Sequence, residues 1–286
     1  GLVSVASKDV TGKTVPKTRR GRLTGFTTAL SGVLTLLLGL VLAIRVTGTP
    51  DAWTLAVLLG AAAALWILAG GIFATISEAP GATAGGEDAI REALARLDLL
   101  RTDHGFRRFV GVRALLISTG LAAPFYVILA RESSDGSGLL GSFVLASGLA
   151  AALASGFWGR FSDRSSRQVL VSAATVAATL GLVVFLLDMA GLVSQNPWMA
   201  PLAFFFLSVA HSGIRVGRKT YLLDMASGIR RTDYVAVSNS VIGVALLLGG
   251  AVGFLTPVIG PSGVLLVLSM MGYSGAYWGR KLPETQ

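Results

Sequence analysis

The sequence predicts an all-α integral membrane protein with eight transmembrane helices. Of its 286 residues, 53% are hydrophobic and only 14% are charged, which leaves too little polar surface to cover a soluble globule of this length. The apolar residues form eight runs, and 22 of the 24 Lys and Arg residues lie in or beside alternate loops, leaving only Arg45 and Arg131 on the others. Because short loops rich in Lys and Arg stay on the cytoplasmic side, this asymmetry predicts both the spans and their direction.

Each run is close to the roughly 20 residues that cross a hydrocarbon core about 30 Å thick. The predicted spans are, in order, Thr24–Val46, Ala52–Ile76, Phe109–Ala130, Leu139–Trp158, Val169–Leu187, Trp198–Ile214, Val235–Leu255 and Ser262–Trp278. An even number of crossings returns the chain to the side on which it started. Both ends are therefore expected to be cytoplasmic, with the protein in the inner (plasma) membrane of the cell.

The net charge of +9 is spread over separate loops, without the aromatic interleaving or the motif that predicts nucleic-acid binding. Attraction to anionic headgroups explains the excess, so the expected partner is the lipid bilayer. With no cysteine, the chain offers no disulfide, thiolate nucleophile or thiolate metal ligand. A metal site is also disfavoured, because the only histidine besides His211 is His104, which lies in a polar insert. No cofactor is expected.

The polar insert, Ser77–His104, separates the first two spans from the last six. Within it, Glu87–Arg101 has the periodicity of an amphipathic helix and is expected to lie at the membrane surface. The chain also contains an internal repeat, since a shift of 211 residues places Gly32 on Gly243 within similar basic and apolar surroundings. Six crossings separate the two copies, so they should run in the same direction, as parallel repeats of transporters do.

The loop between the fourth and fifth spans carries a motif, Gly159-Arg-Phe-Ser-Asp163-Arg164-Ser-Ser-Arg167-Gln168. It resembles the Gly-x-x-x-Asp-Arg-x-Gly-Arg-Arg motif of the major facilitator superfamily, which follows the second helix of that family and, in degraded form, the eighth. Gly159, Asp163, Arg164 and Arg167 match the family's pattern. Gln168 replaces its final arginine, and the serine two positions earlier replaces its second glycine, so the likeness is to the degraded form.

The resemblance implies a partial major-facilitator fold, truncated at the N-terminus, with the eight spans as helices five to twelve of the family. Residues 1–76 would be the remnant of the N-terminal half, namely the end of helix four and helices five and six. Residues 77–106 would be the central cytoplasmic loop, and residues 107–286 the six-helix C-terminal half.

The residue types of the motif predict a cytoplasmic latch. Gly159 would let a neighbouring helix approach closely. Asp163 can accept hydrogen bonds at a helix N-terminus, where the partial positive charge favours a carboxylate, or pair with Arg215 or Arg218. By resemblance, the helix that it caps begins at Gly21–Gly25. The alternative is ordinary positive-inside topology, which needs only the arginines of the loop.

Polar residues inside the spans are candidates for a transport path, because each is costly in lipid unless it faces a cavity or a partner. Arg113 either faces a central cavity or snorkels to the cytoplasmic interface, and its depth of about one turn favours snorkelling. Tyr126 follows Pro124, which should kink or loosen the helix by removing a backbone donor. This tyrosine either lines the path or packs in the core.

Two further polar candidates, and three glycines, lie in the sixth and seventh spans. His211 can change charge near neutral pH and so serve proton coupling or solute binding, although a neutral histidine bonded between helices is commoner. Asn239 either reaches the cavity or bonds across helices, and the second role is favoured. Gly243, Gly249 and Gly253 are expected to serve close helix packing.

These features predict a secondary active transporter that moves a small solute by alternating access, as a monomer. The basic and neutral polar candidates favour an anionic or polar solute, and a coupling ion such as H⁺ is a candidate partner. No Asp or Glu lies in the central third of any span. The alternative is a transporter-derived sensor or scaffold without transport activity. An enzyme is not expected, because no cluster of nucleophile, acid and base is visible.

Overall fold

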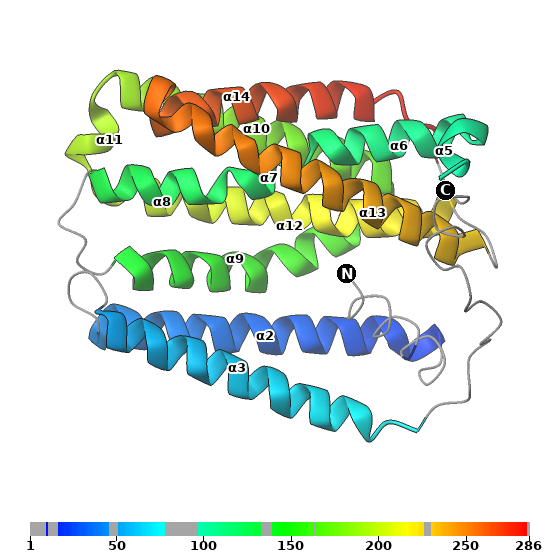
Figure 1. Ribbon diagram of the computed structural model, residues 1–286, viewed down its shortest axis with the longest axis horizontal. Coiled ribbons are helices and arrows are strands. Elements are labelled where there is room, and N and C mark those ends of the chain that lie inside the picture. The colour runs from blue at the N-terminus through cyan, green and yellow to red at the C-terminus, as the bar shows by residue number, and fades with distance from the viewer. Residues whose placement is uncertain are drawn as a thin grey trace.

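The computed structural model describes residue 10 and residues 17–45, 51–77, 97–132, 139–162, 164–225 and 230–284 (Figure 1). Every regular element in these ranges is a helix, which confirms the predicted all-α class. The main elements are α2 (Lys17–Arg45), α3 (Ala52–Ala74), α5 (Leu99–Thr102), α6 (His104–Leu115), α7 (Ser118–Leu121), α8 (Ala123–Glu132), α9 (Leu139–Ser162), α10 (Ser166–Met189), α11 (Leu192–Gln195), α12 (Met199–Met225), α13 (Arg230–Gly250), the 3-10 helix η1 (Ala251–Leu255) and α14 (Thr256–Gly279).

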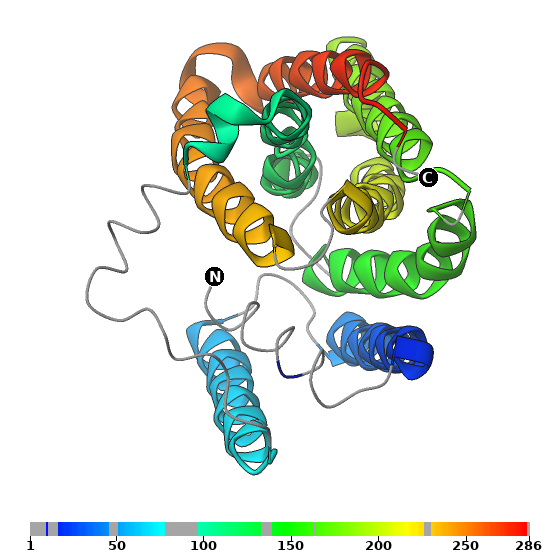
Figure 2. The ribbon, with the colours of Figure 1, turned by 90° about the vertical axis from the view of Figure 1, so that its right-hand side faces the viewer.

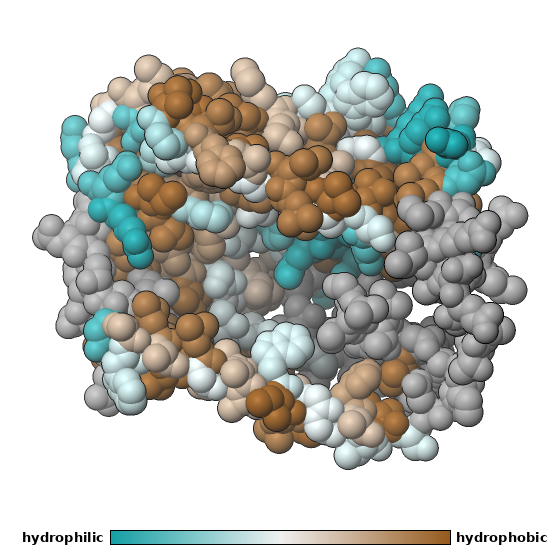
Figure 3. Space-filling view, in the orientation of Figure 1, coloured by the Kyte–Doolittle hydropathy of each residue, from teal (hydrophilic) through white to brown (hydrophobic). Residues whose placement is uncertain are grey.

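Six helical segments of the described chain are long and apolar enough to cross a membrane: Ala52–Ala74, His104–Glu132, Gly141–Ser162, Ser166–Met189, Met199–Leu222 and Asp233–Gly279. Their outer faces carry large apolar side chains; α3 has no buried residue, and Ile67 is 77% exposed. Apolar atoms run along the body of the molecule, while polar atoms gather mainly at its two ends (Figure 3). Water-soluble monomers rarely expose such a surface. The chain is therefore a multi-pass membrane protein.

The segment Asp233–Gly279 folds back on itself. As one straight helix its 47 residues would extend about 70 Å, more than twice the thickness of the hydrocarbon core. Instead, η1 follows α13, and Gly260 has a φ of +70°, which glycine adopts without strain, just before Pro261. Accordingly, α13 and α14 lie antiparallel in Figure 1. This segment contains the predicted seventh and eighth spans.

The described part of the first predicted span lies within α2, whose apolar stretch Leu30–Leu42 is shorter than the six segments above. The total of eight crossings therefore stays a prediction. The helix ends that adjoin the basic loops gather at one end of the bundle, on the right of Figure 1, and α2 runs in the same direction as α13, as the repeat predicts. Most of the predicted amphipathic helix Glu87–Arg101 lies outside the described residues.

The predicted third span is broken into α6, α7 and α8. Pro124 lacks a backbone donor, and its ring clashes with the carbonyl four residues earlier, at Gly120. The chain tightens around it, where the N–H of Phe125 donates to the carbonyl of Ala122 at 3.0 Å. The helix is therefore loosened at Pro124, which is one of the two predicted effects of this proline.

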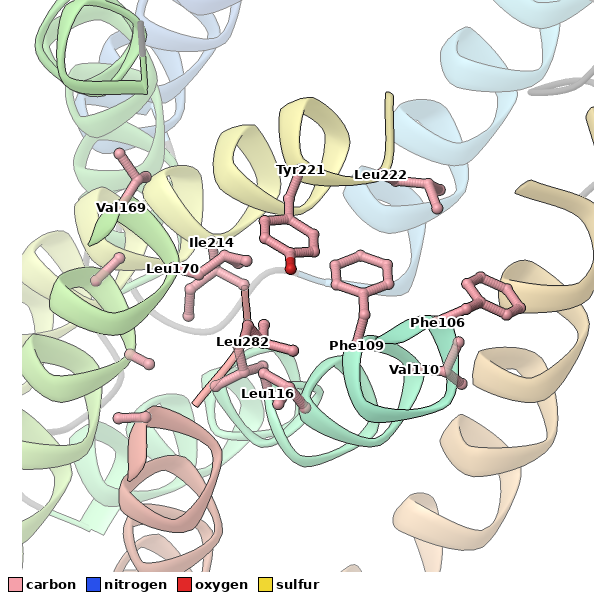
Figure 4. Packing of buried hydrophobic residues seen from close by; sticks show 14 of the residues in the cluster. Phe106, Phe109, Val110, Leu116, Val169, Leu170, Ile214, Tyr221, Leu222 and Leu282 are labelled. Carbon is pink, nitrogen blue, oxygen red and sulfur yellow. The ribbon is translucent and has the colours of Figure 1, made fainter. Parts of the chain in front are cut away.

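Aromatic contacts hold α6 against α12 and α13. Phe109 of α6 stacks on Tyr221 of α12 with ring centroids 5.0 Å apart, inside a cluster of buried side chains (Figure 4). Phe106 packs against Tyr234 of α13, with centroids 4.5 Å apart. Each aromatic pair contributes about 0.5–1.5 kcal/mol beyond its buried area. These contacts fix the three helices that surround the cavity described below.

The most extensive helix contact among the described elements joins α2 to α9, two helices that lie side by side when the bundle is viewed along its axis (Figure 2). A Cβ on Gly39 would lie 2.6 Å from the backbone nitrogen of Leu145, and a Cβ on Gly148 would lie 2.7 Å from that of Leu36. Small residues let helix backbones approach in lipid, where dispersion and not water exclusion holds helices together.

The predicted packing glycines differ in how closely other helices approach them. A Cβ on Gly249 would lie 2.8 Å from Cδ1 of Leu121, so close packing is confirmed there. A Cβ on Gly159, Gly243 or Gly253 would meet no described atom within 4 Å, so close contact with the described chain was a wrong prediction at these three positions. In α13 the reason is orientation, because the neighbouring Leu247 is 82% exposed and this part of the helix faces outward.

Asp103 ties the start of α6 to α13. Its carboxylate accepts hydrogen bonds from the Phe106 N–H at 2.9 Å and from the Tyr234 hydroxyl at 2.6 Å. The bond from Tyr234 lowers the pKa of Asp103 below its ordinary value of 3.8. Because the folded pKa is the lower one, the carboxylate stabilises the folded state above the unfolded pKa of about 4, and this contribution is lost as the pH falls through the folded pKa.

We expect Asp103→Asn to reduce the loss of thermal stability that the protein shows on acidification below about pH 4. Unfolding in detergent across this pH range measures the effect. Asp98→Asn is the control, because the Asp98 side chain makes no capping hydrogen bond. An acid-induced loss that is equal in wild type and Asp103→Asn would contradict the assignment.

Candidate functional site

A cavity of about 180 Å³ lies between α6, α12 and α13. Its charged and titratable side chains are Arg113 from α6 and His211 and Arg218 from α12. The apolar part of its wall includes Leu116, Ile117, Leu170, Ile214, Ile242 and Leu246. At roughly 30 Å³ per water molecule this volume equals about six waters, well below the 300–1,000 Å³ or so of a drug-sized site. The space suits a small solute.

Arg113 is held inside the bundle by α13. One terminal guanidinium nitrogen donates to the Ser238 hydroxyl at 2.6 Å, and the other donates to the Asn239 side-chain carbonyl at 2.9 Å. The Nε atom is buried and has no partner among the described residues. Of the two roles predicted for Arg113, these contacts favour the one beside the cavity over snorkelling, because the two acceptors hold its charge there. Asn239 takes its favoured role, a bond across helices.

His211 is bonded across helices through one ring nitrogen. Its Nδ1 lies 3.0 Å from the Thr119 Oγ1, and the Thr119 hydroxyl donates to the Leu116 carbonyl at 2.9 Å. A hydroxyl has only one proton to donate, so it must accept from the histidine. We therefore assign the proton of the neutral ring to Nδ1, which leaves Nε2 as the acceptor.

Arg218 was expected in the loop after the sixth span, as a partner of Asp163. The helix does not end at Ile214, however, because charge ends an apolar run without ending a helix, and arginine is a good helix former. α12 continues to Met225, so Arg218 lies two turns after His211 on the same face and lines the cavity. In the described chain its side chain makes no hydrogen bond or ion pair.

Tyr126 packs in the core and does not line the cavity. Its side chain is fully buried among apolar residues of α8, α12 and α14, including Leu207 and Leu268. Its hydroxyl has no hydrogen-bond partner among the described residues. Of the two roles predicted for Tyr126, core packing is the one that the structure supports.

Arg167 of the motif loop binds the C-terminal segment. It forms an ion pair with Glu284 at 2.7 Å and donates to the Leu282 carbonyl at 3.1 Å. Ser165 caps α10 by accepting from the Gln168 N–H at 3.1 Å, and its hydroxyl contacts the same Glu284 carboxylate. The loop thus fastens the end of the chain to the start of α10.

The rest of the latch is not brought together in the described chain. Asp163 lies outside the described residues, as do the side chains at Gly21–Gly25. Arg164 and Arg215 are exposed, and Gly159 has no close neighbour, as noted above. The latch therefore remains a prediction.

A larger groove of about 490 Å³ is open to the surface beside α10, with Arg167, Gln168 and Arg280 at its edge. It lies outside the bundle and contains none of the predicted path residues, so the smaller internal cavity is the better candidate site. Among the described residues, no three His, Asp or Glu side chains come together in a way that could hold a metal ion.

Three site residues were missed or misplaced by sequence reasoning: Thr119, Ser238 and Arg218. The spacing from His211 to Arg218 is a readable signal, because residues seven apart share a helix face. The pairing of Arg113 with Ser238 joins residues 125 apart in the chain and has no signal in one sequence. A small hydroxyl such as that of Thr119 becomes noteworthy only once its neighbour is known.

Comparisons of the chain with protein-family models, with curated proteins and with solved structures find no match.

Proposed function

We propose that the chain is a secondary transporter of the major-facilitator type that moves a small solute across the plasma membrane by alternating access. The observation that best supports this is the internal cavity lined by Arg113, His211 and Arg218. Ionisable side chains within membrane-spanning segments are costly in lipid and mark the paths of solutes and ions. The small volume of the cavity favours a small polar solute over a drug-sized one.

Two further features support a transporter with eight crossings. The helix ends that adjoin the basic loops gather at one end of the bundle, which favours a cytoplasmic face there. The shared direction of α2 and α13 fits a pair of parallel repeats related by an axis along the membrane normal.

A test of alternating access needs no knowledge of the solute. The chain has no cysteine, so Ile117→Cys and Leu246→Cys each place one thiol in the cavity wall. A membrane-impermeant maleimide is added to right-side-out or to inverted vesicles. We expect each thiol to react from both sides, because a transporter opens its binding site to each side in turn.

The control is Leu129→Cys, which replaces a side chain that is 1% exposed in the core and should stay unreactive from both sides. Reaction of the cavity thiols from one side only, or from neither, would contradict transport. That result would favour the sensor or scaffold.

A further inference from the structure

We propose that the cavity binds a small oxyanion, a carboxylate or a phosphate, through Arg113 and Arg218. That this anion is the transported solute rests on the proposed function, whereas the binding itself does not. The charged part of the cavity wall is cationic. Two arginines line it, and no described Asp or Glu does.

Arg113 and Arg218 line the same cavity of about 180 Å³, so their like charges lie close together. Like charges in a low-dielectric bundle are unfavourable unless a counter-charge offsets them. The described groups that Arg113 contacts, Ser238 and Asn239, are neutral. A bound anion would supply the missing negative charge.

Unused hydrogen-bond donors point to the same ligand. An arginine carries five N–H groups. Arg113 uses two of them on Ser238 and Asn239, one from each terminal nitrogen, so each terminal nitrogen keeps one further N–H. Arg218 lines the cavity with its side chain partly exposed, and no hydrogen bond or ion pair joins it to another described residue. Carboxylates and phosphates are the acceptors that match guanidinium groups in geometry and charge.

The hydrogen bonds from Arg113 to α13 keep its guanidinium in place. Because Ser238 and Asn239 orient the Arg113 guanidinium from one side, the remaining N–H groups of its terminal nitrogens are fixed without a ligand. A binding group that is oriented in advance loses less conformational freedom when the ligand arrives. The cavity volume of about 180 Å³ limits the ligand to a few non-hydrogen atoms beyond its charged group.

The test measures protection of the cavity thiol in Ile117→Cys. The full chain is placed in vesicles made only of phosphatidylcholine, so that no anionic lipid headgroup can occupy the site. Maleimide labelling is timed with sodium acetate, with inorganic phosphate, and with tetramethylammonium chloride at equal ionic strength. We expect at least one of the two oxyanions to slow labelling by about threefold or more, and tetramethylammonium chloride to have no effect.

Substitutions at the arginines then show which side chains the protection depends on. Adding Arg218→Gln should weaken it by about tenfold or more, because charge-assisted bonds contribute about 1.5–3 kcal/mol. Arg218→Lys should keep part of the protection, since it retains the charge. Arg107→Gln should keep all of it, because Arg107 is exposed on α6 and does not line the cavity wall. If Arg218→Gln does not fold, Arg113→Gln provides the same comparison.

The proposal is overturned if neither oxyanion protects, if tetramethylammonium chloride protects equally, or if both neutral variants are protected like wild type. Its failure is distinct from that of the transporter. Oxyanion protection with labelling from one side only would leave the binding site standing and contradict transport. Labelling from both sides without oxyanion protection would support transport and contradict the oxyanion site.

Discussion

A variant carrying both Gly32→Cys and Ala152→Cys is expected to form a disulfide on mild oxidation. A Cβ on Gly32 would lie 3.7 Å from the Ala152 Cβ, and disulfides join Cβ atoms about 3.8 Å apart. The wild-type chain has no cysteine, so any bond within one molecule must report the contact of α2 with α9. Mass spectrometry of the digested protein measures the cross-link.

Adding Gly148→Val to this variant should slow the cross-link by about tenfold or more. The new Cβ would lie 2.7 Å from the backbone nitrogen of Leu36 and 2.9 Å from its Cα, and a helix backbone cannot rotate away as a side chain can. Overpacking of this kind costs about 1–3 kcal/mol, which is about one to two factors of ten in the population of the packed state.

The matched control for this prediction is Gly70→Val in α3, where a Cβ would meet no described atom within 4 Å. It should leave the cross-linking rate as it is. Equal rates with and without Gly148→Val would show that the two helices do not pack through this glycine.

Replacing Arg113 with methionine is expected to abolish oxyanion protection while changing the free energy of unfolding little. The variant loses two charge-assisted hydrogen bonds, each contributing about 1.5–3 kcal/mol. It also loses the desolvation penalty of a partly buried cation, which is several kcal/mol and of opposite sign. The net change in unfolding free energy should therefore stay within about 2 kcal/mol, while protection falls by about tenfold or more.

Unfolding in detergent and the thiol-protection assay measure the two effects of Arg113→Met side by side. Arg107→Met is the control, because Arg107 lies on the same helix and is exposed. It should change neither measurement. A destabilisation well above 3 kcal/mol or so with protection intact would mean that Arg113 is a structural hydrogen-bond centre and not a binding group.

Periodicity and hydropathy predicted the helices well because both act locally. The structure places helices over all the predicted spans, and Pro124 breaks its helix through its own missing donor. Hydropathy failed at the end of the sixth span, where Arg215 ends the apolar run but not the helix. Solvation in the membrane and helix formation are separate preferences. Arg218 is favourable for the helix although its charge is unfavourable in the membrane.

Tertiary contacts explain the other differences. A glycine packs closely only where a partner helix lies, so Gly249 meets Leu121 whereas Gly243, on the same helix, meets no described atom. From the sequence alone, Arg113 was expected to reach the cytoplasmic membrane interface, because it lies only a short way into its span. The acceptors that hold it inside, Ser238 and Asn239, come from a helix more than a hundred residues later. Such pairings depend on topology, which a single sequence predicts only coarsely.

The most direct test of the membrane path uses one introduced cysteine at a time. Thiols at Ser77, Arg164 and Lys281 replace residues at the basic-loop end of the bundle, and thiols at Asp51 and Gln195 replace residues at the other end. In vesicles of known orientation, we predict that an impermeant maleimide labels the first three from the cytoplasmic side only and the last two from the opposite side only. Labelling of Ser77→Cys and Arg164→Cys from opposite sides would contradict the account.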